Sequence, residues 1–463
     1  MTPWLGPALD YVSSWLDFQL RYQQQPGLAI AVMQGDRLVL EKAWGAADLD
    51  GGEALTPRHG FRIASHSKSF TAAGLLKLAE QGRLRLDDEV GRYVQGLHPD
   101  IAAATLRQIV SNSAGLTRDG PDAGQFTDRR PYLDKASLLA DLAAAPPLPA
   151  AQRFKYSNHG FALLGLVIET VTETPYATWI AREVIAEAGL AETTPGIEGW
   201  GGRPRAKGHS GRLPLGRRVV IPADNPGQAM DAAAGFVATA ADLARFFAQL
   251  SPKAERSLLS PLSRREMSRR HWEDRESALG RHYGLGTISG GQGDWRWFGH
   301  SGGFQGFITR TSVFPDQDLT LSVLTNAIDG LAHPWHDGIV QILKRFKEGG
   351  APAPAHADWR GRWWTLWRCG DLVPVGDTVL IADPALLDPF LDAPEITLIA
   401  PDEGRIDRAS GFHSPGETVR LNRAADGSVA SVQLAGTLVL PEAAMKAEME
   451  ARYGAPRPEP LSA

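Results

Sequence analysis

A serine and a lysine three residues apart are the first residues of this sequence that could do chemistry. Ser65 and Lys68 lie in the segment SHSK, the only Ser-x-x-Lys of the chain. Residues three apart on a helix share a face, so the lysine nitrogen can lie beside the serine hydroxyl. A serine becomes a useful nucleophile when a neighbouring base takes its proton. The pair therefore predicts a nucleophilic serine, and the alternative is a helix cap followed by a solvated lysine.

A tyrosine and an asparagine form the second candidate. Tyr156 and Asn158 lie in FKYSNHGFALLG, the only Tyr-x-Asn of the chain. A tyrosine whose pKa is lowered by a nearby lysine can act as a general base, and an asparagine can bind a substrate amide. The alternative is a surface turn that opens the next helix, since Ser and Asn are favourable N-caps.

The third candidate is a histidine followed by glycines. His300 begins the triplet His-Ser-Gly and precedes GGFQGF, in which Gly302 and Gly303 lack side chains that would keep a substrate backbone away. His-x-Gly is a common pattern, and only His300 combines it with a strand-like run. The other three occurrences are interpreted as loop histidines: His209, His282 and His336.

The elements that must position these residues suggest α+β organisation. Residues 27–40 read as a hairpin around a Gly-Asp turn, and a helix is expected to follow Ser65 and end near Gly82. Strand-like runs return from Tyr283, and an amphipathic helix is expected over residues 335–346. Strands at both ends of a long helical middle predict an antiparallel sheet closed by the first and last segments.

The C-terminal part differs in pattern. Residues 349–356 include GGAPAPA and are predicted to be a linker between a domain of residues 1–348 and a small all-β barrel of residues 357–463. Short β-rich runs recur in this tail between Gly, Asp and Pro. Its tryptophans are expected in the barrel core, with a ligand surface as the alternative: Trp363, Trp364 and Trp367.

Composition excludes several classes of protein. The 463 residues are 43% hydrophobic and 22% charged with a net charge of −5, so we expect no nucleic-acid binding. The single cysteine, Cys369, cannot form an internal disulfide, and His333 and His336 lack a third metal ligand at suitable spacing. We expect neither a metal nor an organic cofactor. No apolar run is long enough to span a bilayer and the first residues do not read as a signal peptide, so we expect a cytoplasmic protein without membrane contact.

Taken in order, the three motifs resemble those of the serine β-lactamase and penicillin-binding-protein superfamily, in its class C-type branch of D-aminopeptidases, DD-carboxypeptidases and esterases. The related β-lactamases carry Ser-x-x-Lys, Ser-Asp-Asn and Lys-Thr-Gly. Here Tyr156 stands in the second motif and His300 replaces the third-motif lysine. The resemblance covers residues 20–346 and implies an antiparallel sheet with a helical lobe. The tail resembles the lipocalin-like barrels of some relatives. Further stretches that fit are LRQIVSNSAGL, AAAGFVATAADLARF and YGLG.

The resemblance implies a role for each motif residue. Ser65 would form an acyl-enzyme, Lys68 would lower the pKa of Ser65 and Tyr156, and Tyr156 would shuttle the proton. Asn158 would orient the substrate amide, and the N–H groups of Ser65 and Gly303 would form the oxyanion hole. The remaining two residues would border the substrate: His300 and Gly302. Because a histidine binds a carboxylate less strongly than a lysine at neutral pH, we expect substrates without a free C-terminal carboxylate there.

The expected function is that of a serine peptidase or amidase resembling D-aminopeptidases. Its substrate would be a small peptide, amide or ester. An esterase, or a trans-acting peptide cyclase or acyl transferase, is the alternative within the same fold. A penicillin-type sensor that turns over slowly is the alternative outside enzymes. The oligomeric state stays open.

A rival motif overlaps the third candidate. Residues 299–303 read GHSGG, which matches the Gly-x-Ser-x-Gly nucleophile elbow of α/β-hydrolases with Ser301 as nucleophile. An elbow requires a helix after the serine, whereas the following residues are rich in glycine and β-formers. We therefore expect Ser301 to have no catalytic role.

Overall fold

The computed structural model describes residues 2–454, which divide into two compact units. Residues 24–336 form one unit. The other combines the residues up to Gln23 with those from Asp337 onward. The second division falls inside helix α10 (Ala332–Gly349). No helix of the described residues is long and apolar enough to cross a membrane.

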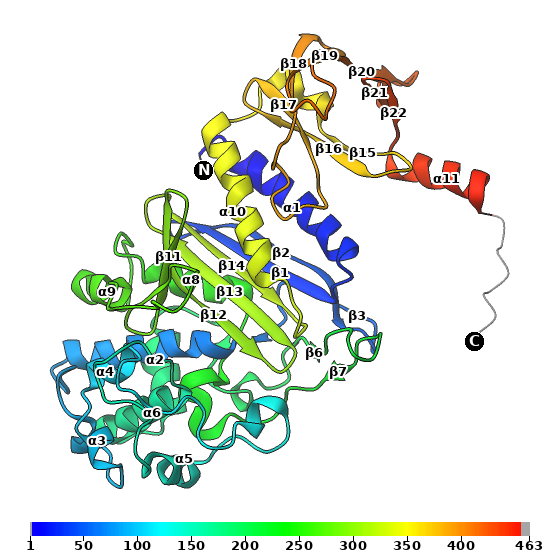
Figure 1. Cartoon of the computed structure of the whole chain (residues 1–463). Coiled ribbons are helices and arrows are strands. Elements are labelled where there is room, and N and C mark those ends of the chain that lie inside the picture. Colours follow the sequence, from blue (N-terminus) through cyan, green and yellow to red (C-terminus); the bar gives the residue numbers. More distant parts are fainter. Residues whose placement is uncertain (1, 455–463) are drawn as a thin grey trace. The chain divides into compact units, whose positions relative to one another are not determined.

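An antiparallel sheet of nine strands is the centre of the unit of residues 24–336 (Figure 1). Its order is β3-β2-β1-β14-β13-β12-β11-β10-β9. Strands β1 and β14 are neighbours, with Leu28 opposite Thr325, so the first and last strands of the unit meet and the predicted closure of the sheet is confirmed. The strands are β1 (Gly27–Gln34), β2 (Arg37–Asp48), β3 (Glu53–Ala54), β9 (Trp272–Glu273), β10 (His282–Tyr283), β11 (Ile288–Gln292), β12 (Trp295–Phe304), β13 (Phe307–Phe314) and β14 (Leu319–Thr325).

Helices of this unit pack on the sheet and form a lobe beside it. Helix α8 (Ala240–Gln249) begins at the N-cap Thr239 and packs against β1 and β14. Helix α2 (Ser67–Glu80) is buried on every side from Ser67 to Leu78, as expected of a core helix without a polar face. Figure 1 shows α2 grouped with α4 (Leu106–Val110) and α6 (Asn158–Thr172) in the helical lobe.

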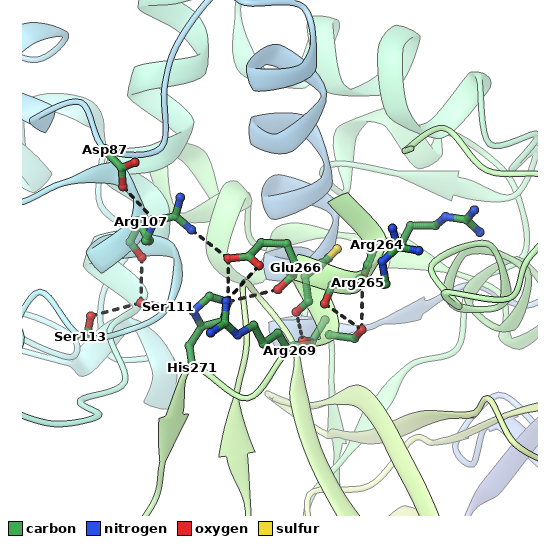
Figure 2. A network of polar contacts seen from close by, with 12 residues as sticks. Asp87, Arg107, Ser111, Ser113, Arg264, Arg265, Glu266, Arg269 and His271 are labelled. Atoms are coloured by element: carbon green, nitrogen blue, oxygen red, sulfur yellow. Dashed lines mark hydrogen bonds and ion pairs between the residues drawn. The ribbon is translucent and has the colours of Figure 1, made fainter. Parts of the chain in front are cut away.

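A polar network joins α4 to a further helix, α9 (Pro261–Ser268), as Figure 2 shows. Arg107 on α4 donates to Asp87 Oδ1 at 2.9 Å and to Glu266 Oε1 at 3.0 Å. Glu266 lies on α9 and also pairs with Arg269 and His271. Partly exposed pairs of this kind stabilise by about 1 kcal/mol or less each. The network therefore links the first turn of α4 to α9 and to Asp87.

The other unit contains the predicted small barrel. Eight strands follow one another as neighbours from β15 to β22. Trp364 and Leu440 exchange backbone hydrogen bonds of 2.7 and 2.9 Å, which nearly closes the sheet on itself. The strands are β15 (Gly361–Trp364), β16 (Cys369–Val375), β17 (Thr378–Ala382), β18 (Glu395–Ala400), β19 (Glu403–Arg408), β20 (Thr418–Arg423), β21 (Val429–Leu434) and β22 (Thr437–Val439).

The division into units differs from the boundaries expected from the sequence. Helix α1 (Leu5–Tyr22) belongs with the barrel rather than with a domain of residues 1–348. Trp15 Nε1 donates to the Leu386 carbonyl at 3.2 Å, and Gln19 Nε2 donates to the Pro384 carbonyl at 2.7 Å. An amphipathic pattern shows that a helix has an apolar face but not which distant segment covers that face.

The stretch predicted as a linker, residues 349–356, carries regular contacts. Ala353 N donates to the Gly376 carbonyl at 2.9 Å, and a 3₁₀ turn, η8, spans Pro354–Trp359. Trp359 is fully buried and donates from Nε1 to the Pro401 carbonyl at 3.0 Å. Residues 349–356 have the Gly/Pro/Ala composition that is typical of linkers. Trp359, which follows them, packs in the core of the barrel and anchors this stretch there.

Candidate active site

Ser65 lies at a constrained junction between a strand and a helix. The short strand β4 (Phe61–Arg62) leads into a 3₁₀ turn, η1 (Ala64–His66), and then into α2. Ala64 has a φ of +50°, a left-handed conformation that costs a non-glycine residue about 1–2 kcal/mol. Ser67 Oγ stabilises the turn by donating to the Ala64 carbonyl at 2.6 Å. Ser65 is partly exposed between buried neighbours, so its hydroxyl is the accessible group of the turn.

Lys68 is fully buried with its Nζ at the centre of the site. The nitrogen lies 3.2 Å from Ser65 Oγ, 2.6 Å from Asn158 Oδ1 and 2.7 Å from the Ala233 carbonyl. Burial lowers the pKa of Lys68 well below 10.5, and the positive charge of Arg118 lowers it further, while Asp119 opposes the shift. Two N–H groups are held by Asn158 and Ala233 in either protonation state, which leaves the third position of the nitrogen facing Ser65.

Tyr156 lies on the other side of the serine. Its ring centroid is 4.8 Å from Lys68 Nζ. Burial raises the pKa of Tyr156 above 10, although the neighbouring Ser65 and Arg118 act in the opposite direction. The tyrosine is therefore a neutral phenol at neutral pH. The sequence predicted a lowered pKa instead. The pKa is raised because the free-energy cost of burying a charged phenolate exceeds the stabilisation that its neighbours provide.

Asn158 lies between Lys68 and Asp119 and hydrogen-bonds with both. It is the first residue of α6, whose N-cap Ser157 accepts from Gly160 N at 2.8 Å. Its Oδ1 accepts from Lys68, and its Nδ2 donates to Asp119 Oδ1 at 2.5 Å. Both ends of the amide are occupied, so its orientation is fixed by Lys68 and Asp119.

Three residues that the sequence motifs do not include lie around Tyr156 and Asn158: Asn112, Arg118 and Asp119. Arg118 Nε donates to Asp119 Oδ2 at 2.9 Å, and the Arg118 guanidinium lies 5.1 Å from the Tyr156 ring centroid. Asn112, in the segment LRQIVSNSAGL, accepts from Ser157 N at 2.9 Å and from Lys155 N at 2.7 Å. That segment is among the stretches that carry the family resemblance, but no pattern in the sequence points to Arg118 or Asp119.

His300 lies on β12, close to the tyrosines. Its ring centroid is 6.5 Å from that of Tyr156, and its Nε2 is 3.3 Å from the Tyr283 hydroxyl. Burial lowers the pKa of His300 well below 6.5, and His66 and Lys68 lower it further. The imidazole is therefore neutral, so it offers no charge to a substrate carboxylate.

The two glycines after His300 have different surroundings. A Cβ at Gly302 would lie 2.3 Å from the Ile63 carbonyl oxygen and 2.5 Å from Thr309 Oγ1. Only glycine therefore lets β12 approach the backbone that precedes Ser65. Gly303 is exposed, and a Cβ there would meet only Ile308 at 3.7 Å, so its backbone is accessible to a ligand.

Ser301 does not form a nucleophile elbow. It lies within β12, opposite Arg310 on β13, and β13 follows where an elbow requires a helix. The Gly-x-Ser-x-Gly match at residues 299–303 is therefore a strand sequence, as expected from its β-forming neighbours.

Together these groups can perform nucleophilic acyl chemistry. The site contains an accessible hydroxyl, a buried amine with a lowered pKa at 3.2 Å from it, and a neighbouring neutral phenol. An amine can take the hydroxyl proton, and a phenol can give a proton to a leaving group.

Comparisons with known proteins agree with this geometry. The Beta-lactamase family model matches residues 16–334. Protein flp of Staphylococcus aureus (strain MRSA252) is 26% identical over 189 residues, which are 40% of this chain and 37% of that protein. The chain thus spans well under half the length of that curated relative.

Solved structures share the fold. The octameric penicillin-binding protein homologue from Pyrococcus abyssi has a TM-score of 0.63 at 19% identity, covering 93% of this chain and 99% of that one. A D-stereospecific amidohydrolase from Streptomyces sp. has a TM-score of 0.55 at 25% identity, covering 68% of this chain and 93% of that one. Since the family match extends over well more than half of its residues, this chain belongs to the Beta-lactamase family.

Proposed function

We propose that this protein is a serine hydrolase that cleaves peptide or amide bonds through an acyl-enzyme on Ser65, with a D-aminopeptidase-like preference. The observation that carries the proposal is the position of Lys68 Nζ, 3.2 Å from Ser65 Oγ with its two other contacts fixed. A buried amine held in this way is a base directed at a single hydroxyl.

The first half-reaction begins with the neutral amine of Lys68. It takes the proton of the Ser65 hydroxyl while Ser65 Oγ attacks the substrate carbonyl carbon, and the carbonyl oxygen becomes an oxyanion. The N–H groups of Ser65 and Gly303 donate to that oxyanion, an interaction worth about 3–4 kcal/mol per donor in known cases. The C–N bond then breaks as the Tyr156 phenol gives its proton to the departing amine, and Lys68 returns a proton to Tyr156.

The second half-reaction repeats these steps with water. Tyr156 and Lys68 together remove a proton from the water that attacks the ester carbonyl of the acyl-enzyme. The proton then passes to Ser65 Oγ as the ester bond breaks, which restores the starting state. Every proton taken from a nucleophile is therefore returned to a leaving group.

The surroundings of the site support an amide substrate without a free carboxylate at His300. The neutral imidazole supplies no positive charge there. The likeness to a D-stereospecific amidohydrolase from Streptomyces sp., at 25% identity, supports a D-residue beside the scissile bond.

Two neighbouring charges should move the acid limb of the pH–rate profile in opposite directions. Activity requires neutral Lys68, so kcat/KM rises as the pH passes the pKa of Lys68. Asp119 raises this pKa, so Asp119→Asn should shift the limb to lower pH. Arg118 lowers it, so Arg118→Gln should shift the limb to higher pH. The measurement is kcat/KM against pH for both variants.

Asp122→Asn is the matched control for this pair, since Asp122 is an exposed carboxylate nearby that pairs with Arg130. Its limb should coincide with that of the wild type. Shifts of the same sign in the Asp119 and Arg118 variants would contradict the role of Lys68 as base and would indicate a general disturbance of the site.

A small substrate panel tests the proposed activity. We expect D-alanyl p-nitroanilide to be hydrolysed faster than the L-alanyl compound, and the activity to disappear in Ser65→Ala. Turnover of p-nitrophenyl butyrate alone would indicate an esterase or acyl-transferring cyclase instead. An acyl-enzyme that persists for hours, detected as a mass increase of the intact protein, would indicate a slowly turning over sensor.

A further inference from the structure

The barrel carries a partly open cavity that the proposed hydrolase chemistry does not use. Its volume is about 490 Å³, which falls in the range of about 300–1,000 Å³ typical of small-molecule sites. Strands β15, β16, β17, β21 and β22 and the segment after β17 contribute the walls. The walls are mainly apolar, with side chains such as Trp363, Leu372, Ile381, Leu391, Val432 and Leu434.

Charged groups at the cavity disfavour an anion. Asp383 and Asp392 line it, against a single permanent cation, Arg368. The lining histidine, His413, is engaged through Nδ1 with Ser410 Oγ at 3.0 Å. Two carboxylates against one guanidinium repel a carboxylate-bearing occupant such as a fatty acid. An uncharged molecule meets no such repulsion.

Some of the apolar side chains that line the cavity are exposed to solvent, so a ligand can reach them from outside. Trp367 is 93% exposed and Leu391 is 65% exposed, although both line the cavity. Large apolar side chains gathered at a cavity are typical of binding sites. We propose that the barrel binds a small uncharged apolar molecule, for which a medium-chain alkyl ketone serves as the probe. This site depends only on barrel residues and is independent of the proposed hydrolase activity.

The only cysteine of the chain gives a direct reporter of occupancy. Cys369 lines the cavity and is 7% exposed. The full-length protein is treated with N-ethylmaleimide, and the single mass increase is followed with and without 2-decanone. We expect saturating ketone to slow the modification at least fivefold, whereas decanoate at the same concentrations should leave the rate unchanged. Glutathione with the same mixtures controls for direct effects on the reagent.

Variants at two leucines distinguish binding in this cavity from binding to other apolar surface. Leu434 lines the cavity, whereas Leu438 on the neighbouring strand is 51% exposed and lies outside the lining. Leu434→Gln should raise the ketone concentration for half-protection at least fivefold, and Leu438→Gln should leave it unchanged. If Leu434→Gln does not fold, as judged by circular dichroism, Leu391→Gln replaces it, since Leu391 is an exposed wall residue.

Three outcomes would overturn the proposal. The first is a rate of Cys369 modification that ketone leaves unchanged. The second is equal protection by decanoate, which would contradict the argument from Asp383 and Asp392. The third is an equal effect of the Leu434 and Leu438 variants, which would place the ketone outside the cavity.

Discussion

Replacing Ser65 with alanine should lower the hydrolysis of every substrate by on the order of 10⁴-fold or more, as loss of a catalytic nucleophile does in other serine hydrolases. The amine of Lys68 and the phenol of Tyr156 remain in place, but neither lies in a position to form the ester. The measurement is kcat/KM for the best substrate of the panel. Mass spectrometry of the intact protein should also show an acyl adduct in the wild type that Ser65→Ala lacks.

The fold should survive this change. Ser65 is partly exposed, and its Oγ contacts Lys68 rather than the backbone of the turn. The turn itself is held by Ser67, which is unchanged. Ser301→Ala is the matched control, since it removes a hydroxyl from β12 and should keep most of the activity. A Ser65→Ala protein with more than a tenth of the wild-type rate, or an inactive Ser301→Ala protein, would contradict the assignment.

The chemical motifs were predictable because they lie within short stretches of sequence. A serine and a lysine three apart meet on one helical turn, and the structure places Lys68 Nζ beside Ser65 Oγ. The order of strands and helices likewise indicated a sheet closed by its first and last segments, which the β1–β14 pairing confirms.

The groups that tune these motifs were not predictable, because they come from distant parts of the chain. Asp119 lies 39 residues before Asn158, and Asn112 lies 45 residues before Ser157. No local periodicity links such positions. The raised pKa of Tyr156 has a similar origin, since burial by surrounding elements outweighs the neighbouring charge that the sequence suggested. The contacts of helix α1 with Pro384 and Leu386 likewise join segments that are far apart in the sequence.

Replacing Lys68 with methionine should lower kcat/KM by about 10²–10⁴-fold, the range typical of lost acid–base catalysis. Methionine fills most of the same space without the nitrogen, so Ser65 loses its base. Asn158 Oδ1 and the Ala233 carbonyl lose a donor as well. A buried acceptor without a partner costs about 1–3 kcal/mol of folding stability. The midpoint of thermal unfolding should therefore fall together with the rate.

Lys68→Arg separates two ways in which the lysine could act. If Lys68 served only as a fixed cation beside the Ser65 alkoxide, arginine would retain the charge and recover a large part of the activity. If it is the base, arginine should be as inactive as methionine, because a guanidinium does not release its proton in the working pH range. The lowered pKa of Lys68 and its contact with the hydroxyl favour the second result. A folded Lys68→Arg protein with near wild-type kcat would therefore assign the proton transfer to another group, and the first candidate is the phenol of Tyr156, which neighbours Ser65.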